Sequence, residues 1–132
     1  MIYLSETHYY GFSVGCGDCT NTRAELLALW SVIRVCHLMG LPIKMIYGDS
    51  LVVISWVNGS SALDVPTLKH WCDDIIYMLR MAPQVSINHI FREHNTLADG
   101  LSKQALLLDM GIGHFTETMD GLTIREGLFS LF

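Results

Sequence analysis

The stretch "TNTRAELLALWSVIRVCHLMGLPIKMIYGDS", residues 20–50, decides the fold class. Residues 23–39 are apolar around most of a helical surface, which is typical of a helix packed in the middle of a domain. Gly40 and Pro42 follow, and these residue types predict the end of the helix. Residues 43–47 then have the pattern of a short buried strand. A helix that leads directly into a buried strand predicts an α/β protein.

The elements on either side extend this pattern. Residues 1–4 and 9–14 are rich in aromatic and β-branched side chains and predict a hairpin. Four more elements are expected downstream: a helix over 51–57, a helix opened by Asp64, a strand over 85–91, and a helix over 96–108 that Asn95 caps. Strand–helix–strand units imply a parallel pair with right-handed crossovers. We therefore expect a mixed sheet flanked by helices.

Residues 1–108 hold all of these elements and are interpreted as one domain. Residues 109–132 form a C-terminal tail to which no structure is assigned, and it ends in the apolar run "GLFSLF". An apolar end of this kind is expected to dock on the domain or on a partner.

The composition limits the class of protein. Hydrophobic residues make up 51% of the 132 residues and charged residues 16%, which is typical of a folded domain with a core. The formal net charge of −5 argues against a general nucleic-acid binder. It does not exclude an enzyme that meets phosphate through bound cations.

The cysteines and the chain start suggest an intracellular protein. Cys16 and Cys19 form a single CxxC without a partner motif at zinc-finger spacing, so neither zinc nor a redox role is favoured. We expect reduced cysteines. The first ten residues lack the pattern of a signal peptide, and no apolar run reaches the length of a membrane span. The expected location is the cytoplasm or the nucleus.

Three acidic residues each have a plain structural explanation. Glu25 fits a capping box that starts at Thr22, and Asp49 stands where it can cap the following helix. Asp99 lies one turn into the last helix, where the helix dipole favours a negative charge. Taken together, however, all three lie at strand ends or helix starts, where functional groups gather in α/β sheets.

Carboxylates that converge in a partly buried site repel each other by several kcal/mol. Hard cations such as Mg²⁺ relieve this repulsion, because they prefer oxygen ligands. Two such ions about 3.5–4 Å apart are the usual arrangement for phosphodiester cleavage.

Three motifs in order, "TNTRAELLAL", "YGDSLVVISWVNG" and "REHNTLADGLSKQAL", resemble the type 1 ribonuclease H fold. The similarity covers about residues 1–108, and the nearest branch is that of plant domains derived from retroelement reverse transcriptases. The resemblance implies a five-stranded mixed sheet flanked by helices. It also implies Mg²⁺-dependent hydrolysis of the RNA strand of RNA/DNA hybrids by four carboxylates, with Mn²⁺ as a substitute ion.

The resemblance also assigns roles to individual residues. The implied catalytic residues are Glu25, Asp49, Asp99 and His94, of which the three carboxylates are also the implied metal ligands. The implied substrate-binding residues are Thr20, Asn21, Ser50 and Asn95. A role for His94 as a mobile histidine competes with a plain role as an exposed residue before a helix cap.

One feature departs from the family pattern. The first carboxylate of the family lies on a central first strand, whereas residues 1–4 match the second strand and no Asp precedes Glu6. We therefore expect a weak or inactive metal site and a sheet with its first, central strand missing. Unpaired buried backbone groups cost about 1–3 kcal/mol each. Three outcomes stay open: the sheet closes around the gap, a strand from a partner protein or from self-association completes it by strand addition, or the chain is a fragment of a longer protein.

Three possible functions follow from these observations. The first is a ribonuclease H-like nucleic-acid domain that binds RNA/DNA hybrid or other nucleic acid, with weak or no hydrolysis. The alternative is a protein-interaction module that uses the open sheet edge and the apolar tail. A third possibility is a nuclease completed in trans by a partner that donates both the strand and the Asp.

Overall fold

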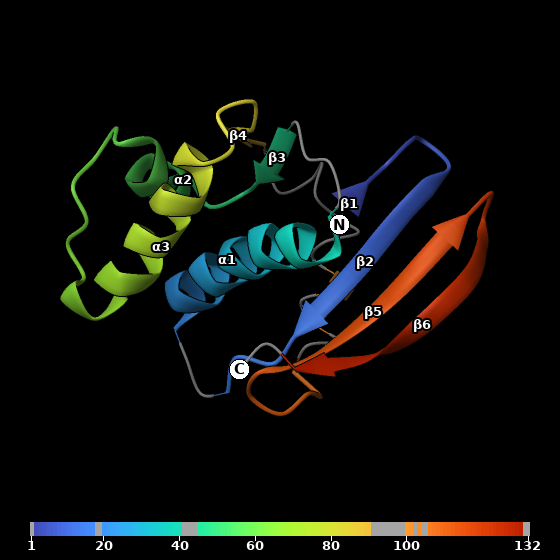
Figure 1. The fold of residues 1–132 in the computed structure, drawn as a ribbon. Coiled ribbons are helices and arrows are strands. Elements are labelled where there is room, and N and C mark those ends of the chain that lie inside the picture. The colour runs from blue at the N-terminus through green and yellow to red at the C-terminus, as the bar shows by residue number, and fades with distance from the viewer. Residues whose placement is uncertain are drawn as a thin grey trace. The chain divides into compact units, whose positions relative to one another are not determined.

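The computed structural model describes residues 2–17, 20–40, 45–90, 100–101, 103 and 106–130 (Figure 1). The chain divides into two compact units. Residues 1–18 and 96–132 form one of them, here called the sheet unit, and residues 19–95 form the other, here called the helical unit. Among the described residues, no helix is both long and apolar enough to cross a membrane.

The sheet unit contains a four-stranded antiparallel sheet. Its strands are β1 (Ile2–Tyr3), β2 (His8–Val14), β5 (Ile112–Met119) and β6 (Leu122–Ser130). They pair in the order β1-β2-β5-β6 (Figure 1). The N-terminal hairpin expected from the aromatic and β-branched pattern is confirmed by the pairing of β1 with β2.

The C-terminal residues, to which the sequence assigned no structure, form the hairpin β5–β6. Every residue of β2 pairs with β5, from His8 opposite Met119 to Val14 opposite Gly113. The end of the chain thus continues the sheet that its beginning starts. The division of the chain into a domain of residues 1–108 and a separate tail stays a prediction.

The turn between β5 and β6 consists of Asp120 and Gly121, both with positive φ, at 52° and 81°. Two such residues make a tight turn whose twist matches that of paired strands, and Asp-Gly is a preferred sequence for it. The backbone N–H of Asp120 also donates to the carbonyl of Thr7 at 2.9 Å, so the tips of the two hairpins are joined.

In its described residues, the helical unit contains three α-helices, a 3₁₀ turn and two parallel strands. Its elements are α1 (Asn21–Met39), β3 (Met45–Gly48), α2 (Leu51–Asn58), the 3₁₀ turn η1 (Pro66–Leu68), α3 (Lys69–Arg80) and β4 (Ser86–His89). β3 and β4 are parallel, with Met45 opposite Ser86. The predicted helices, the two strands and their parallel pairing are therefore confirmed to within a few residues.

The core of the helical unit lies between α1 and α3. Leu26, Cys36 and Ile75 are fully buried, and the Trp30 and Trp71 rings meet edge to face at 5.0 Å between centroids. α1 ends at Gly40 in the left-handed conformation, as its residue type predicts. The mixed α/β class, with helices beside sheet strands, is as the sequence predicted. Residues 100, 101 and 103 of the expected last helix are helical.

Candidate functional site

Asp49 stands at the carboxyl end of β3, immediately before α2. Gly48, the last residue of the strand, accepts a backbone hydrogen bond from Ile90 at 2.9 Å, which fixes the strand end. The cap of α2 is Ser50, whose hydroxyl accepts from the backbone N–H of Val53 at 3.4 Å. The expectation that Asp49 caps this helix is therefore wrong. Asp49 is half-buried at the strand end and outside the cap.

Glu25 lies on α1, and its predicted capping role is also wrong. The helix begins at Asn21 with Thr20 as its cap, and the Thr20 hydroxyl accepts from the backbone N–H of Arg23 at 3.2 Å. Thr22 is already inside the helix, so a capping box from Thr22 to Glu25 does not form. Glu25 is half-buried and lies beyond the first turn, which holds no acidic residue.

The substrate-binding residues predicted at the start of α1 are exposed. Thr20 and Asn21 both lie on the surface. Next to them, Nε of Arg23 is buried and makes no hydrogen bond to the described residues. The amino-terminal end of α1 therefore combines a cationic side chain with the positive end of a helix dipole, an arrangement that favours anions.

Three predicted site residues, Asp99, His94 and Asn95, lie outside the described residues. Glu25 and Asp49 belong to the same compact unit, and their oxygen atoms are the donor type that Mg²⁺ prefers. Within the described ranges, no three His, Cys, Asp or Glu side chains are grouped closely enough to hold a metal ion. The convergence of three carboxylates thus stays a prediction.

A polar network in the sheet unit was missed by the sequence analysis. Glu117 on β5 is only 8% exposed. Its carboxylate lies 2.6 Å from Nε2 of His8 and 3.1 Å from Nε of Arg125. Arg125 also donates to the hydroxyl of Tyr10 at 3.3 Å. The network spans three neighbouring strands, so only the register of the folded sheet brings these residues together.

The network shifts two protonation equilibria. The hydrogen bond with His8 is the main cause that lowers the pKa of Glu117, with further lowering from Tyr10 and Arg125. Burial is the main cause that raises the pKa of Tyr10, and Glu117 adds to the effect. Glu117 is thus held as a carboxylate and Tyr10 as a phenol at neutral pH. Since the carboxylate is satisfied by its three neighbours, the network is a structural clamp across the strands.

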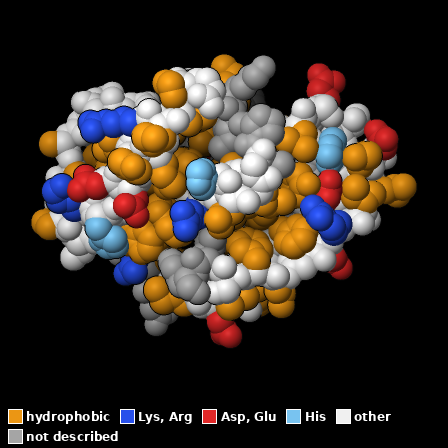
Figure 2. All heavy atoms as spheres, viewed as in Figure 1, with side chains coloured by type: hydrophobic (Ala, Val, Ile, Leu, Met, Phe, Trp, Pro, Cys, Tyr) orange, Lys and Arg blue, Asp and Glu red, His pale blue; other side chains and the backbone are white. Residues whose placement is uncertain are grey.

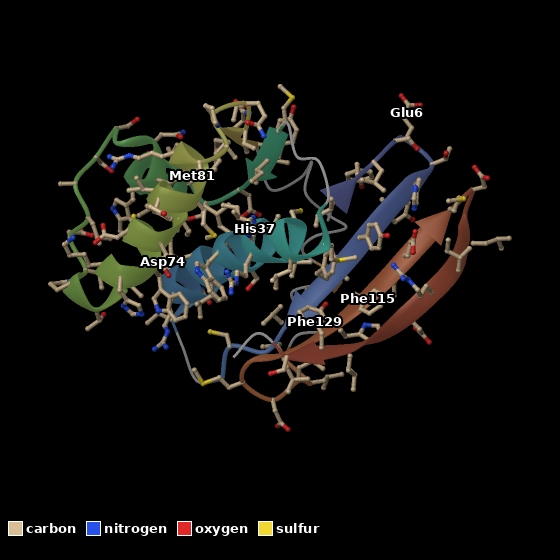
Figure 3. All side chains as sticks on the ribbon, viewed as in Figure 1. Glu6, His37, Asp74, Met81, Phe115 and Phe129 are labelled. Atoms are coloured by element: carbon tan, nitrogen blue, oxygen red, sulfur yellow. The ribbon has the colours of Figure 1, made fainter. Side chains whose placement is uncertain are left out.

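Aromatic rings cover the same face of the sheet beside this network. Phe12 packs against Phe115 and Phe129, with ring centroids 6.4 and 6.0 Å away. The guanidinium of Arg125 lies 5.7 Å from the centroid of the Phe115 ring. Phe115 and Phe129 project from one face of the four-stranded sheet (Figure 3). Residues 127–130 of the apolar C-terminal run are therefore part of the sheet itself.

The cysteines differ in part from expectation. Cys16 is disulfide-bonded, so the prediction that every cysteine is reduced is wrong at this position. Cys36 on α1 and Cys72 on α3 are free and buried, as expected for reduced cysteines. Burial raises the pKa of Cys36 to about 11 and also raises that of Cys72, so both thiols stay protonated at neutral pH.

Comparison with known proteins places this arrangement in a family. Residues 8–105 match the family described as "Reverse transcriptase-like". The "Uncharacterized protein YpeP" of Bacillus subtilis is 36% identical over 92 residues, which are 66% of this chain and 40% of that protein. The "Putative ribonuclease H protein At1g65750" of Arabidopsis thaliana is 28% identical over 120 residues, which are 88% of this chain and 19% of that protein. The chain thus spans less than half the length of either relative.

Two solved structures share the fold. Ribonuclease H1 from the halophilic archaeon Halobacterium salinarum NRC-1 superposes with a TM-score of 0.61 at 29% identity over 68% of both chains. LC11-RNase H1, isolated from compost by a metagenomic approach, superposes with a TM-score of 0.65 at 27% identity over 71% of both chains. The family match, these structures and the mixed α/β fold agree: the chain belongs to the reverse transcriptase-like family and is a ribonuclease H-like domain.

Proposed function

We propose that this chain is a nucleic-acid domain in which Glu25, Asp49 and Asp99 hold a divalent cation at the backbone of an RNA/DNA hybrid. The observation that carries the proposal is the identity of the two helix caps. Because the hydroxyls of Thr20 and Ser50 occupy these positions, neither Glu25 nor Asp49 is required as a cap. Glu25 on α1 and Asp49 at the end of β3 belong to one compact unit, and their half-buried carboxylates are the donor type that Mg²⁺ prefers.

Each residue has a defined part in this proposal. Glu25 and Asp49 would supply oxygen ligands to Mg²⁺ or Mn²⁺, and the ion, when bound, would polarise the phosphate and lower the pKa of water. Thr20 and Asn21 would contact the hybrid backbone beside the amino-terminal end of α1. Ser50 fixes the first turn of α2, and so holds Asp49 at the end of β3.

We further propose that the 132 residues hydrolyse the hybrid weakly. Glu25, Asp49 and Asp99 match three of the four carboxylates of the family pattern. A two-metal site that lacks one shared ligand binds its ions less tightly and positions them less well. Hybrid binding depends less on that ligand, because it also draws on the helix start.

The test is binding and cleavage of one labelled RNA/DNA hybrid by the purified protein in Mg²⁺ and in Mn²⁺. We expect binding that prefers the hybrid to double-stranded DNA of the same sequence, and slow cleavage of the RNA strand that Asp49→Asn abolishes. Asp74→Asn is the matched control, because Asp74 lies exposed on α3 (Figure 3). A folded protein that neither prefers the hybrid nor cleaves it would contradict the proposal.

A protein-interaction module is the second candidate, favoured by the exposure of β3. Strands of parallel sheets are normally covered on both faces, yet Met45 is 59% exposed and Tyr47 is 52% exposed. An added strand or domain from a partner would cover them. The candidates differ in their response to metal: an interaction module keeps the same stability with and without Mg²⁺, and with and without Asp49→Asn.

A further inference from the structure

β6 is the outer strand of the four-stranded sheet (Figure 1). One side pairs with β5, and no other strand among the described residues pairs with its opposite side. The outer backbone groups of an edge strand can accept another strand. Many native edges are blocked by proline or lysine, and β6 contains neither.

The side chains along this edge are unusually apolar for a surface strand. Leu122 is 70% exposed, Ile124 53% and Leu128 68%. Hydrophobic side chains are visible along this margin of the sheet in the space-filling view (Figure 2). Single exposed apolar residues are common, but several on one strand mark a surface that a partner covers.

The charges of β6 indicate what kind of partner fits. Arg125 pairs with Glu117 at 3.1 Å, and Glu126 lies 3.7 Å from His114, both within the same sheet. A nucleic-acid backbone or an acidic peptide would therefore meet a cation that already pairs with Glu117, and it would also meet the exposed carboxylate of Glu126. A largely apolar strand that carries one charge of each sign fits the edge best, and β6 of a second copy is such a strand.

We propose that two copies of this chain associate by antiparallel pairing of their β6 strands. The β5–β6 pairing shifts register between Glu117 and Thr118 at the turn end of the hairpin, which leaves residues 125–130 of β6 as the regularly paired segment. A two-fold axis at Gly127 would place Arg125 opposite Phe129 of the second copy. The same axis would place Glu126 opposite Leu128 of the second copy.

Charge excludes two of the alternative registers. An axis at Arg125 or at Glu126 would set two like charges directly opposite each other, which destabilises a strand pair. The axis at Gly127 avoids both and sets each arginine against an aromatic ring. Arg125 already makes such a contact with Phe115 in its own sheet. β6 lies beyond residues 8–105, so this inference does not depend on the nucleic-acid function.

Sedimentation velocity of the full chain over a range of concentrations tests the proposal. We expect a reversible dimer, and a weak one, because a single strand edge buries less than the roughly 1,200 Å² of stable interfaces. Leu128→Glu should raise the dissociation constant about tenfold, since it sets a second carboxylate opposite Glu126 of the other copy. Leu128→Lys removes the same apolar side chain but sets an ammonium there, and should keep the dimer within about threefold.

Two controls make the outcome decisive. Leu128 is exposed, so both variants should keep the circular dichroism spectrum and melting temperature of the parent. Tyr77→Glu changes a similarly exposed residue on α3 and should leave the dimer unchanged. A protein that is monomeric at every concentration would overturn the proposal. Equal weakening by both Leu128 variants, or weakening by Tyr77→Glu, would overturn it as well.

Discussion

Nε2 of His8 lies 2.6 Å from Oε2 of Glu117, and this contact joins β2 to a strand that is 109 residues away in the sequence. Arg125 on β6 holds the other oxygen of the same carboxylate at 3.1 Å. One buried acid therefore connects the N-terminal hairpin to both strands of the C-terminal hairpin. Removing one partner of a buried ion pair usually destabilises more than removing an exposed one, so Glu117 is the residue of the sheet unit to test.

The contribution of Glu117 to the stability of the folded chain should change with pH. The pKa of Glu117 is lower in the folded chain than its ordinary value of 4.5, so the charged carboxylate contributes stability above that pH. The contribution is lost as the pH falls through the lowered pKa. Glu117→Gln should reduce the melting temperature at pH 7, and the difference from the parent should shrink below pH 4.5.

Glu126→Gln is the matched control for this series, because Glu126 is on the neighbouring strand with its side chain 68% exposed. Thermal melts of the three proteins across the acid range make the comparison. If the melting temperatures of the parent and Glu117→Gln differed by the same amount at every pH, the charge of Glu117 would not contribute to stability. The substitution would then act through packing alone.

Gly113 makes room for the Phe129 ring. A Cβ atom at Gly113 would lie 2.2 Å from Cζ of Phe129, so Gly113→Ala has to displace the ring from the aromatic cluster. Overpacking of this kind costs about 1–3 kcal/mol. Gly100→Ala is the control, because a Cβ at Gly100 meets nothing within 4 Å. Urea unfolding followed by fluorescence should separate the variants, and equal stability would contradict the described packing.

The start of α1 can be tested by a pair of threonine substitutions. Thr20→Ala removes the hydroxyl that accepts from the N–H of Arg23 and should cost about 0.5–2 kcal/mol of unfolding free energy. Thr22→Ala changes a residue already inside the helix and should have a small effect or stabilise slightly, because alanine favours helices. Denaturant unfolding gives both values. The opposite ranking would restore Thr22 as the cap and Glu25 as its partner.

The free cysteines should resist alkylation in the folded protein. Burial raises the pKa of Cys36 to about 11, which leaves little reactive thiolate at pH 8. Iodoacetamide followed by peptide mass spectrometry should label Cys36 and Cys72 only after denaturation. Labelling of Cys36 at the same rate in the native and unfolded chains would contradict its burial.

Much of the helical unit could be predicted from the sequence, because each of its helices and strands follows from a pattern of neighbouring residues. The long apolar period of α1 and its stop at Gly40, the stripe of α3 and the short strands all follow from residue spacing. The identity of the helix caps did not follow. Thr20 and Thr22 are chemically equivalent cap candidates, and only the folded backbone distinguishes them.

The C-terminal hairpin was missed although a local pattern marks it. Asp120-Gly121 between alternating apolar and polar residues is typical of a tight hairpin turn. The Glu117 network had no such pattern, because its members come from opposite ends of the chain and meet only through the sheet register. The convergence of the predicted catalytic residues likewise depends on the tertiary structure, and it stays a prediction.

The most direct test of the central claim, that Glu25 and Asp49 belong to a metal site, is the melting temperature of the chain as Mg²⁺ is added. At about ten times its dissociation constant, a bound ion stabilises by roughly 1.4 kcal/mol, which is several degrees for a domain of this size. The account predicts such a rise for the parent and for Asp74→Asn, and none for Asp49→Asn. An equal rise in all three proteins, or no rise in the parent, would contradict it.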